Sequence, residues 1–241
     1  MIRIDNTEIF GWESAIRGMR NPMNSWDKSD SNFDCKDCDG CYYIADNHEE
    51  RTDFSVNAWC NHQALRLGEN DLALMKKLVN AGSDHSKFMR MINVTADITA
   101  PLYWWKEYDT YKVGTVANSC STMHKIHDKE FVWEDFSWEH LYSDYDTDNL
   151  GSEELANYIL TALNRYRERY LQTKNKDDWW QMIQLLPSSY NQKRTVQLNY
   201  AVLRNMYFSR RNHKLDEWHT FCEWVEGLPY SELITGEENE A

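Results

Sequence analysis

Two stretches of the chain alternate between apolar and polar residues. From Ile92 to Ile98 the alternation is strict, which is the period of a strand with one buried face. Ile2 and Ile4 alternate with polar neighbours in the same way. We therefore expect strands in these two places.

Apolar residues at helical spacing are more frequent. One helix is predicted where Trp12, Ile16 and Met19 fall on a single face, and a second between an N-cap at Asn70 and a stop at Gly82. Further helices are predicted at residues 102–111, after a start signal at 99–101, in a long segment after 151–152, at about 196–211 and at about 216–226. Because helices outnumber strands, the fold class is α+β.

Residues 21–62 and 114–121 show neither period, and we expect irregular loops there. No repeat and no Pro/Gly-rich linker divides the sequence. The simplest interpretation is a single domain over residues 1–241 that contains a Cys-bearing loop at about 21–62.

Charge limits the classes of partner. The 241 residues include 26 Lys and Arg against 39 Asp and Glu, a formal net charge of −13. An acidic chain is poorly suited to bind the phosphate backbone of nucleic acid. No apolar run approaches the ~20 residues that cross a bilayer, and the beginning of the chain lacks the pattern of a signal peptide. We expect a cytoplasmic protein without a nucleic-acid or membrane partner.

Basic residues are concentrated near the C-terminus. Residues 188–215 contain six of them and no acid, whereas 216–241 contain eight acids and no Lys or Arg. We call the six residues the basic island: Lys193, Arg194, Arg204, Arg210, Arg211 and Lys214. On one helix, Asn199 and Arg210 would lie about three turns, or ~16 Å, apart and could contact one extended ligand. The alternative is a solvated basic face that the acidic segment neutralises.

The cysteines Cys35, Cys38 and Cys41 are spaced by two residues each. Thiolates at this spacing can converge on Zn²⁺ or on an iron–sulfur cluster, with a fourth ligand among His48, Cys60 and His62. The alternative is a set of reduced loop thiols, as is usual in the cytoplasm. Both interpretations make this loop structural rather than catalytic.

Other candidates are isolated. His85 precedes a predicted strand, where it could orient a ligand or pack as an ordinary hydrogen-bonded residue. Nucleotide-binding and acyl-hydrolase motifs of the GxGxxG, P-loop and GxSxG types are missing from the sequence. We assign the aromatic residues Tyr103, Trp104, Trp105 and Tyr108 to the core rather than to a stacking platform.

Two segments resemble the flavin-dependent thymidylate synthases. Leu186-Pro187, Asn199, Leu203, Asn205, Arg210 and Trp218 occur in the order and spacing of that family's C-terminal signature. Residues 100–116 are similar to the helix that leads into the family's R-H-R-x-x-S motif. The resemblance covers about residues 70–228 and implies a domain of the thymidylate-synthase-complementing-protein type, in which long helices flank a small, mostly antiparallel sheet.

The resemblance also implies an activity. The family forms homotetramers that bind FAD, dUMP and a folate, take a carbon from methylene-tetrahydrofolate and use NADPH to reduce the flavin. Arg210 corresponds to the arginine that lies against the pyrimidine, where a guanidinium stabilises negative charge as C5 becomes nucleophilic. By the same resemblance, the flavin would be contacted by His85, Lys112, Asn199 and Asn205. The substrate would be bound by Glu107, Ser119 and Ser121, with Cys120 in the place of Ser121 if no residue is inserted.

The chain departs from the family at several arginines. Thr110-Tyr111-Lys112 stands where the family has R-H-R, and Ala201 and Ile183 replace two further arginines. Another is replaced by Met123 or Thr122, and none of these replacements can grip a phosphate with two parallel hydrogen bonds. The resemblance as a whole implies methylation of dUMP. The replaced arginines leave two alternatives open on the same scaffold: a flavoenzyme that modifies another pyrimidine nucleotide, or a non-catalytic nucleotide-binding protein.

Overall fold

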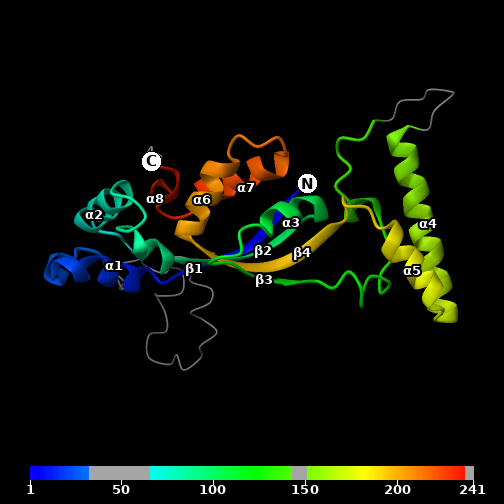
Figure 1. Ribbon diagram of the computed structural model, residues 1–241, viewed down its shortest axis with the longest axis horizontal. Helices are drawn as coiled ribbons and strands as arrows, with labels where there is room; N and C mark the ends of the chain where they lie inside the picture. Colours follow the sequence, from blue (N-terminus) through cyan, green and yellow to red (C-terminus); the bar gives the residue numbers. More distant parts are fainter. Residues whose placement is uncertain (33–65, 143–150, 237–241) are drawn as a thin grey trace, which may run out of the picture. The chain divides into compact units, whose positions relative to one another are not determined.

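The computed structural model of the protein describes residues 1–32, 66–142 and 151–236. Its helices and strands are β1 (Arg3–Phe10), α1 (Trp12–Arg20), α2 (Glu69–Asn80), β2 (Asn93–Pro101), α3 (Leu102–Tyr108), β3 (Val116–Ser119), α4 (Ser152–Thr173), α5 (Lys176–Leu185), β4 (Asn191–Asn199), α6 (Tyr200–Arg210), α7 (Asp216–Glu226) and α8 (Glu232–Thr235) (Figure 1). The strands form one sheet in the order β1-β2-β4-β3. The α+β class with a small antiparallel sheet is confirmed.

The chain divides into two compact units, which we describe separately. Unit 1 comprises Met1–Thr7, Thr95–Gln197 and Ser209–Trp224. Unit 2 comprises Glu8–Val94, Leu198–Phe208 and Val225–Ala241. Within the described residues, no helix is both long and apolar enough to cross a bilayer.

The strands and helices with clear periods form as predicted. In β2, Val94, Ala96 and Ile98 are buried, whereas the residues between them are partly exposed. The apolar face of α1 is buried as well. Gly82 ends the α2 segment with φ of +103°, a conformation that suits glycine.

The predicted helix at 196–211 is wrong in its first part. β4 continues to Asn199, and α6 begins at Tyr200. The Asn199 side chain accepts a hydrogen bond from the Val202 backbone N–H at 3.1 Å, so this residue caps the helix rather than lying on it. Asn199 and Arg210 therefore do not share one helix face. The alternation of buried Val196 and Leu198 with exposed Thr195 and Gln197 indicates a strand.

The predicted loop at 114–121 contains a strand. β3 pairs antiparallel with β4, with Val116 opposite Gln197 and Ser119 opposite Arg194. All four β3 residues are exposed. Because neither face of this strand is buried, its sequence does not alternate between apolar and polar residues. α3 begins at Leu102, as predicted, although the start signal at 99–101 lies within β2, and the helix ends at Tyr108, three residues earlier than predicted.

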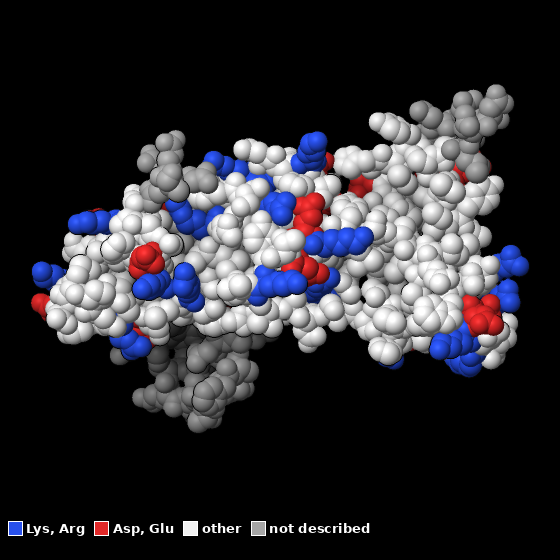
Figure 2. Space-filling model, viewed as in Figure 1, with Lys and Arg blue, Asp and Glu red and all other residues white. Residues whose placement is uncertain are grey.

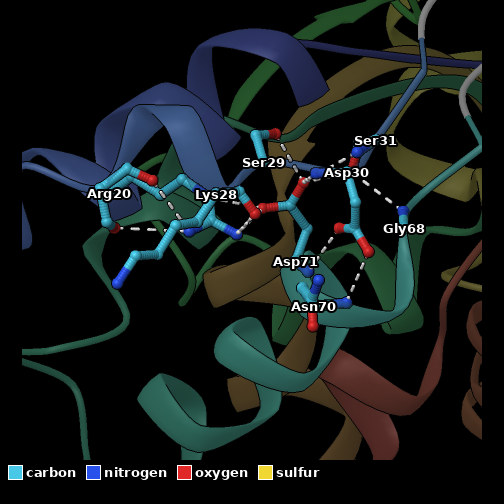
Figure 3. Close-up of polar contacts among 9 residues, drawn as sticks. Arg20, Lys28, Ser29, Asp30, Ser31, Gly68, Asn70 and Asp71 are labelled. Carbon is cyan, nitrogen blue, oxygen red and sulfur yellow. Dashed lines mark hydrogen bonds and ion pairs between the residues drawn. The ribbon is translucent and has the colours of Figure 1, made fainter.

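The N-terminus of α2 is capped from a distant part of the chain. The predicted cap, Asn70, lies inside the helix, which begins at Glu69. The Asp30 carboxylate accepts hydrogen bonds from the Asn70 and Asp71 backbone N–H groups at 2.9 and 3.1 Å (Figure 3). A Cβ atom on Gly68 would lie 2.1 Å from Asp30 Cγ, so this approach requires glycine.

Asp71 and Arg20 form a buried ion pair in unit 2, with 0% and 4% of their surfaces exposed (Figure 3). Arg20 Nε lies 2.7 Å from Asp71 Oδ1, and Ser29 and Ser31 donate to Oδ2 at 2.7 and 2.6 Å. Burial alone would raise the pKa of Asp71, but the hydrogen bonds from Ser31, Ser29 and Arg20 outweigh it, and the pKa is lowered. The pair fixes the segment after α1 against α2.

The core of unit 1 is aromatic. Trp104, Trp105, Tyr108 and Trp218 are at most 2% exposed, and the Trp104 and Trp218 rings lie 4.7 Å apart. Their burial agrees with the assignment of these residues to the core, although Tyr103 is only partly buried. A second apolar cluster combines residues of the segment 126–138 with residues of α4 and α5, two helices that pack against each other (Figure 1).

Candidate functional site

Arg210, the last residue of α6, contacts two aromatic rings of unit 1. Its Cζ lies 5.0 Å from the centre of the Trp218 ring and 5.5 Å from that of Tyr111. Arg210 Nε donates to the Tyr111 hydroxyl at 2.9 Å. Cation–π contacts with two rings fix the plane of the guanidinium.

Glu107 of α3 is the anionic partner of Arg210. Its Oε2 accepts hydrogen bonds from Arg210 Nη1 at 2.8 Å and from Trp218 Nε1 at 3.2 Å. His213 Nε2 lies 3.1 Å from the same oxygen. Three side chains from the C-terminal region therefore converge on one carboxylate oxygen. We call Glu107, Tyr111, Arg210, His213 and Trp218 the Arg210 cluster.

The cluster is open to ligands on part of its surface. The side chains of Arg210, His213 and Glu107 are 18%, 23% and 33% exposed, whereas Trp218 is buried. Among the described residues, the hydrogen-bond partners of the Arg210 guanidinium are those of Nε and Nη1. The Nη2 edge is therefore the part of this planar donor that can bind an acceptor of a ligand.

Two further residues of the basic island, Lys193 and Arg194, are paired with carboxylates of unit 1. Lys193 Nζ lies 2.9 Å from an Asp97 oxygen, and Arg194 pairs with Asp109 at 2.7 Å while lying over the Trp105 ring at 4.1 Å. In unit 2, Arg204 donates to backbone carbonyls near the C-terminus. In Figure 2, several basic groups on the visible face lie beside acidic ones. The partners named in unit 1 precede the island in the sequence, contrary to the expectation that the acidic segment after it neutralises these residues.

The predicted flavin residue Lys112 and the predicted substrate residues Ser119 and Ser121, all in unit 1, lie outside the Arg210 cluster. Lys112 and Ser119 are exposed, in the loop after α3 and at the end of β3. Ser121 Oγ accepts hydrogen bonds from the backbone N–H groups of Met123 and His124 at 3.3 and 2.9 Å. Of the predicted substrate residues, only Glu107 contacts Arg210.

The remaining predicted flavin residues belong to unit 2. His85 is exposed in the turn after Gly82, and Asn205 is exposed on α6. Asn199 is 8% exposed and uses its side-chain oxygen in the helix cap. The predicted metal ligands Cys35, Cys38 and Cys41 lie outside the described residues, and the described part of the chain contains no His, Cys, Asp and Glu group suited to a metal.

Unit 2 also contains an open cavity of about 660 Å³ beside the Arg20–Asp71 pair. Its wall is formed by Arg20, Met23, Ser25, Asp27, Lys28, Ser29, Asp30, Asn70 and Leu74. The nitrogens of Arg20 donate to Asp71, to the Ser25 carbonyl and to the Lys28 carbonyl. Because this guanidinium is fully engaged, we regard the pair as structural.

Two members of the Arg210 cluster carry roles that the sequence did not reveal. His213 was not singled out, and Tyr111 was noted only as a replacement within a motif. The available signal was the spacing of Arg210, His213 and Trp218, which places three polar groups at the junction of two helices. Nothing in the sequence connected them with Glu107, 103 residues before Arg210.

Solved structures share this fold across almost the whole chain. The flavin-dependent thymidylate synthase ThyX from Helicobacter pylori, complexed with FAD and dUMP, matches with a TM-score of 0.62 and 14% identity over 97% of this chain and 98% of its own. A second structure of that protein with FAD and dUMP gives 0.61 and 15% over 98% of each chain. The UMP/dUMP methylase PolB from Streptomyces cacaoi, bound with 5-Br dUMP, gives 0.55 and 13% over 98% and 95%.

No protein-family model matches the sequence, and no curated protein matches it either. The structural matches show that the chain has the fold of the flavin-dependent thymidylate synthases, as the sequence resemblance predicted. The similarity extends to the UMP/dUMP methylase. At 13–15% identity, these matches concern the fold, and activity has to be argued from the residues of this chain.

Proposed function

We propose that this protein is a divergent flavin-dependent thymidylate synthase that methylates dUMP, with Arg210 as its catalytic residue. The observation that carries the proposal is the Arg210 cluster. It presents one edge of an oriented, partly exposed guanidinium on the fold that ThyX shares. The ordered sequence resemblance around Arg210 supports it.

Arg210 would act on the pyrimidine ring. Its Nη2 edge would donate to the O2 and N3 side of the base, where negative charge develops as C5 becomes nucleophilic. Tyr111 and Trp218 hold the guanidinium plane, so little reorganisation is needed when the charge forms. Loss of one such donor typically lowers kcat by about 10²–10³.

FAD would supply the hydride that completes the methyl group, with methylene-tetrahydrofolate and NADPH as co-substrates. Exposed His85 and Lys112 offer donors suited to a flavin, and the predicted contact Asn205 is exposed on α6. For Asn199 the fit is restricted to its amide nitrogen, because the oxygen caps α6. Ser119 and Ser121 would bind the nucleotide. A cytoplasmic homotetramer that combines residues of several copies completes the proposal.

The second candidate is a flavoenzyme that acts on another pyrimidine nucleotide. It is favoured by the pairing of Lys193 with Asp97 and of Arg194 with Asp109, since these cations are engaged and do not replace the missing phosphate-binding arginines. Lys112, Arg211 and Lys214 of unit 1 are exposed and are candidates for that contact, the two lysines as point charges rather than forks. Product analysis by mass spectrometry with dUMP and dCMP distinguishes the two functions.

Arg210→Ala tests the proposed function. We expect tritium release from 5-tritiated dUMP, in the presence of FAD, NADPH and methylene-tetrahydrofolate, to fall about 10²-fold or more while flavin content stays unchanged. The control is Arg17→Ala, which breaks another Arg–Glu pair, at 3.4 Å, on an exposed surface. If the wild-type protein releases tritium from dUMP and Arg210→Ala releases it at the same rate, Arg210 has no role in the mechanism. Wild-type protein that binds neither FAD nor dUMP would refute the function itself.

A further inference from the structure

The carboxylate of Glu107 is fixed beside the ligand-binding edge of Arg210. Its Oε2 receives Arg210 Nη1, Trp218 Nε1 and His213 Nε2 within 3.2 Å. Trp218 is fully buried, so its indole N–H is a rigid anchor for this oxygen. Glu107 therefore cannot move away from Arg210 without leaving a buried donor unpaired.

This arrangement determines which acceptors Arg210 can bind. A ligand oxygen that accepts a hydrogen bond from Nη2 would lie close to Glu107 Oε2, because both nitrogens belong to one small, planar guanidinium and Nη1 already donates to Glu107 at 2.8 Å. A phosphate or carboxylate there would face the negative charge of Glu107. A carbonyl oxygen or ring nitrogen, which carries only partial negative charge, meets a much smaller repulsion.

The neighbouring charges do not cancel this effect. Arg210 and Glu107 neutralise each other, and Asp109, on the turn that follows α3, adds a carboxylate that is itself paired with Arg194. His213 contacts Glu107 through Nε2 at 3.1 Å, whereas its Nδ1 accepts a hydrogen bond from the Leu215 backbone N–H at 3.1 Å. The site therefore offers an oriented donor edge whose guanidinium charge is balanced by Glu107.

We propose that Glu107 is a specificity-determining residue that reserves Arg210 for the uncharged base of a nucleotide and excludes its phosphate. This inference rests on the proposed function for the identity of the base, whereas the exclusion of anions follows from the cluster itself. The Arg210–Glu107 ion pair would then do more than stabilise the fold, because it would also orient the substrate. The phosphate must then bind away from Arg210.

The test compares inorganic phosphate and deoxyuridine as separate probes of the full-length protein. Binding is measured by titration calorimetry and, for phosphate, by ³¹P line broadening. In Glu107→Gln, which keeps the shape and an acceptor oxygen, we expect phosphate affinity to rise about tenfold or more and deoxyuridine affinity to change by less than about threefold. Asp109→Asn is the matched control, because it removes the same charge two residues away and should change neither affinity by more than about twofold.

Three outcomes would overturn the proposal. The first is unchanged phosphate binding in folded Glu107→Gln, and the second is an equal gain in Asp109→Asn, which would indicate an effect of net charge. The third is a phosphate gain that persists when Arg210→Gln is added, because the new anion would then bind elsewhere. Failure of wild-type protein to bind deoxyuridine would instead contradict the proposed function, while a phosphate gain in Glu107→Gln would still support anion exclusion.

Discussion

The buried pair of Arg20 and Asp71 provides the sharpest test of how unit 2 is held together. Asp71→Asn keeps the shape of the side chain but removes its charge. Arg20, only 4% exposed, would then carry an uncompensated charge in the interior. Breaking a buried ion pair in this way costs about 3–5 kcal/mol.

The structure supports a value in the upper part of that range. Asp71 also accepts hydrogen bonds from Ser29 Oγ, Ser31 Oγ and the backbone N–H of Ser31, all at or below 3.1 Å, and an amide nitrogen on that side would face these donors. A natural domain is stable by about 5–15 kcal/mol, so the variant would lose a large share of its stability. We expect the urea midpoint to fall by about 1 M or more.

The assay is equilibrium urea unfolding, followed by circular dichroism and tryptophan fluorescence. Asp27→Asn is the matched control, because it removes the same charge from an exposed position of the same segment and should lie within about 0.5 kcal/mol of wild type. The double variant Arg20→Met/Asp71→Leu should recover only the part of the loss that comes from the unpaired charge, since a leucine at this position still leaves the Ser29 and Ser31 donors without an acceptor. A folded Asp71→Asn variant within about 1 kcal/mol of wild type would refute the reasoning.

The pH dependence of the same pair has a defined sign. The pKa of Asp71 is lowered in the folded protein, so its contribution is present above the ordinary aspartate pKa and is lost as the pH falls through the folded value. Wild type and Asp71→Asn should therefore converge in stability on acidification. A gap between them that widens toward low pH would contradict this sign.

Two further predictions concern single side chains. Hydrogen bonds from Thr195, Lys193 and Asn6 lower the pKa of Asp97 to about 2, so its stabilising contribution should persist above pH ~4 and vanish as the pH falls through about 2. The carboxyl ¹³C shift should titrate near that value, and a midpoint near 4 would contradict the network. Asn199→Ala should cost about 1 kcal/mol in urea unfolding through loss of the α6 cap, whereas Asn199→Asp should retain most of it. Equal stability of both variants with wild type would disprove the capping role.

The sequence predicted well those elements in which one face is buried, because their apolar residues then recur with the period of a strand or a helix. β2 alternates because one of its faces is in the core, and α7 was placed at residues 216–226 because its apolar face is continuous. β3 was missed for the converse reason, since all four of its residues are exposed and its pairing with β4 depends on the backbone. Local rules also named Asn70 as a cap, whereas the actual cap, Asp30, lies about forty residues earlier.

In the candidate site, too, the sequence predicted local features but not contacts between distant segments. Arg210 was found from its spacing and family resemblance. Its contact with Glu107 depends on how α3 lies against the segment from Arg210 to Trp218 within unit 1, and sequence periodicity carries no information on that arrangement. The placement of Asn199 on a helix was wrong because one strand and one helix follow each other without a break at residues 199–200.

The visible absorption spectrum of the purified protein, incubated with FAD and then titrated with dUMP, tests the central claim most directly. In the wild-type protein, we expect the absorption bands of bound flavin to shift when dUMP is added, because nucleotide binding at Arg210 would alter the surroundings of the flavin. In Arg210→Ala, we expect the flavin bands to be present but not to shift with dUMP. Protein that retains no flavin, or flavin bands that dUMP leaves unchanged, would contradict the account.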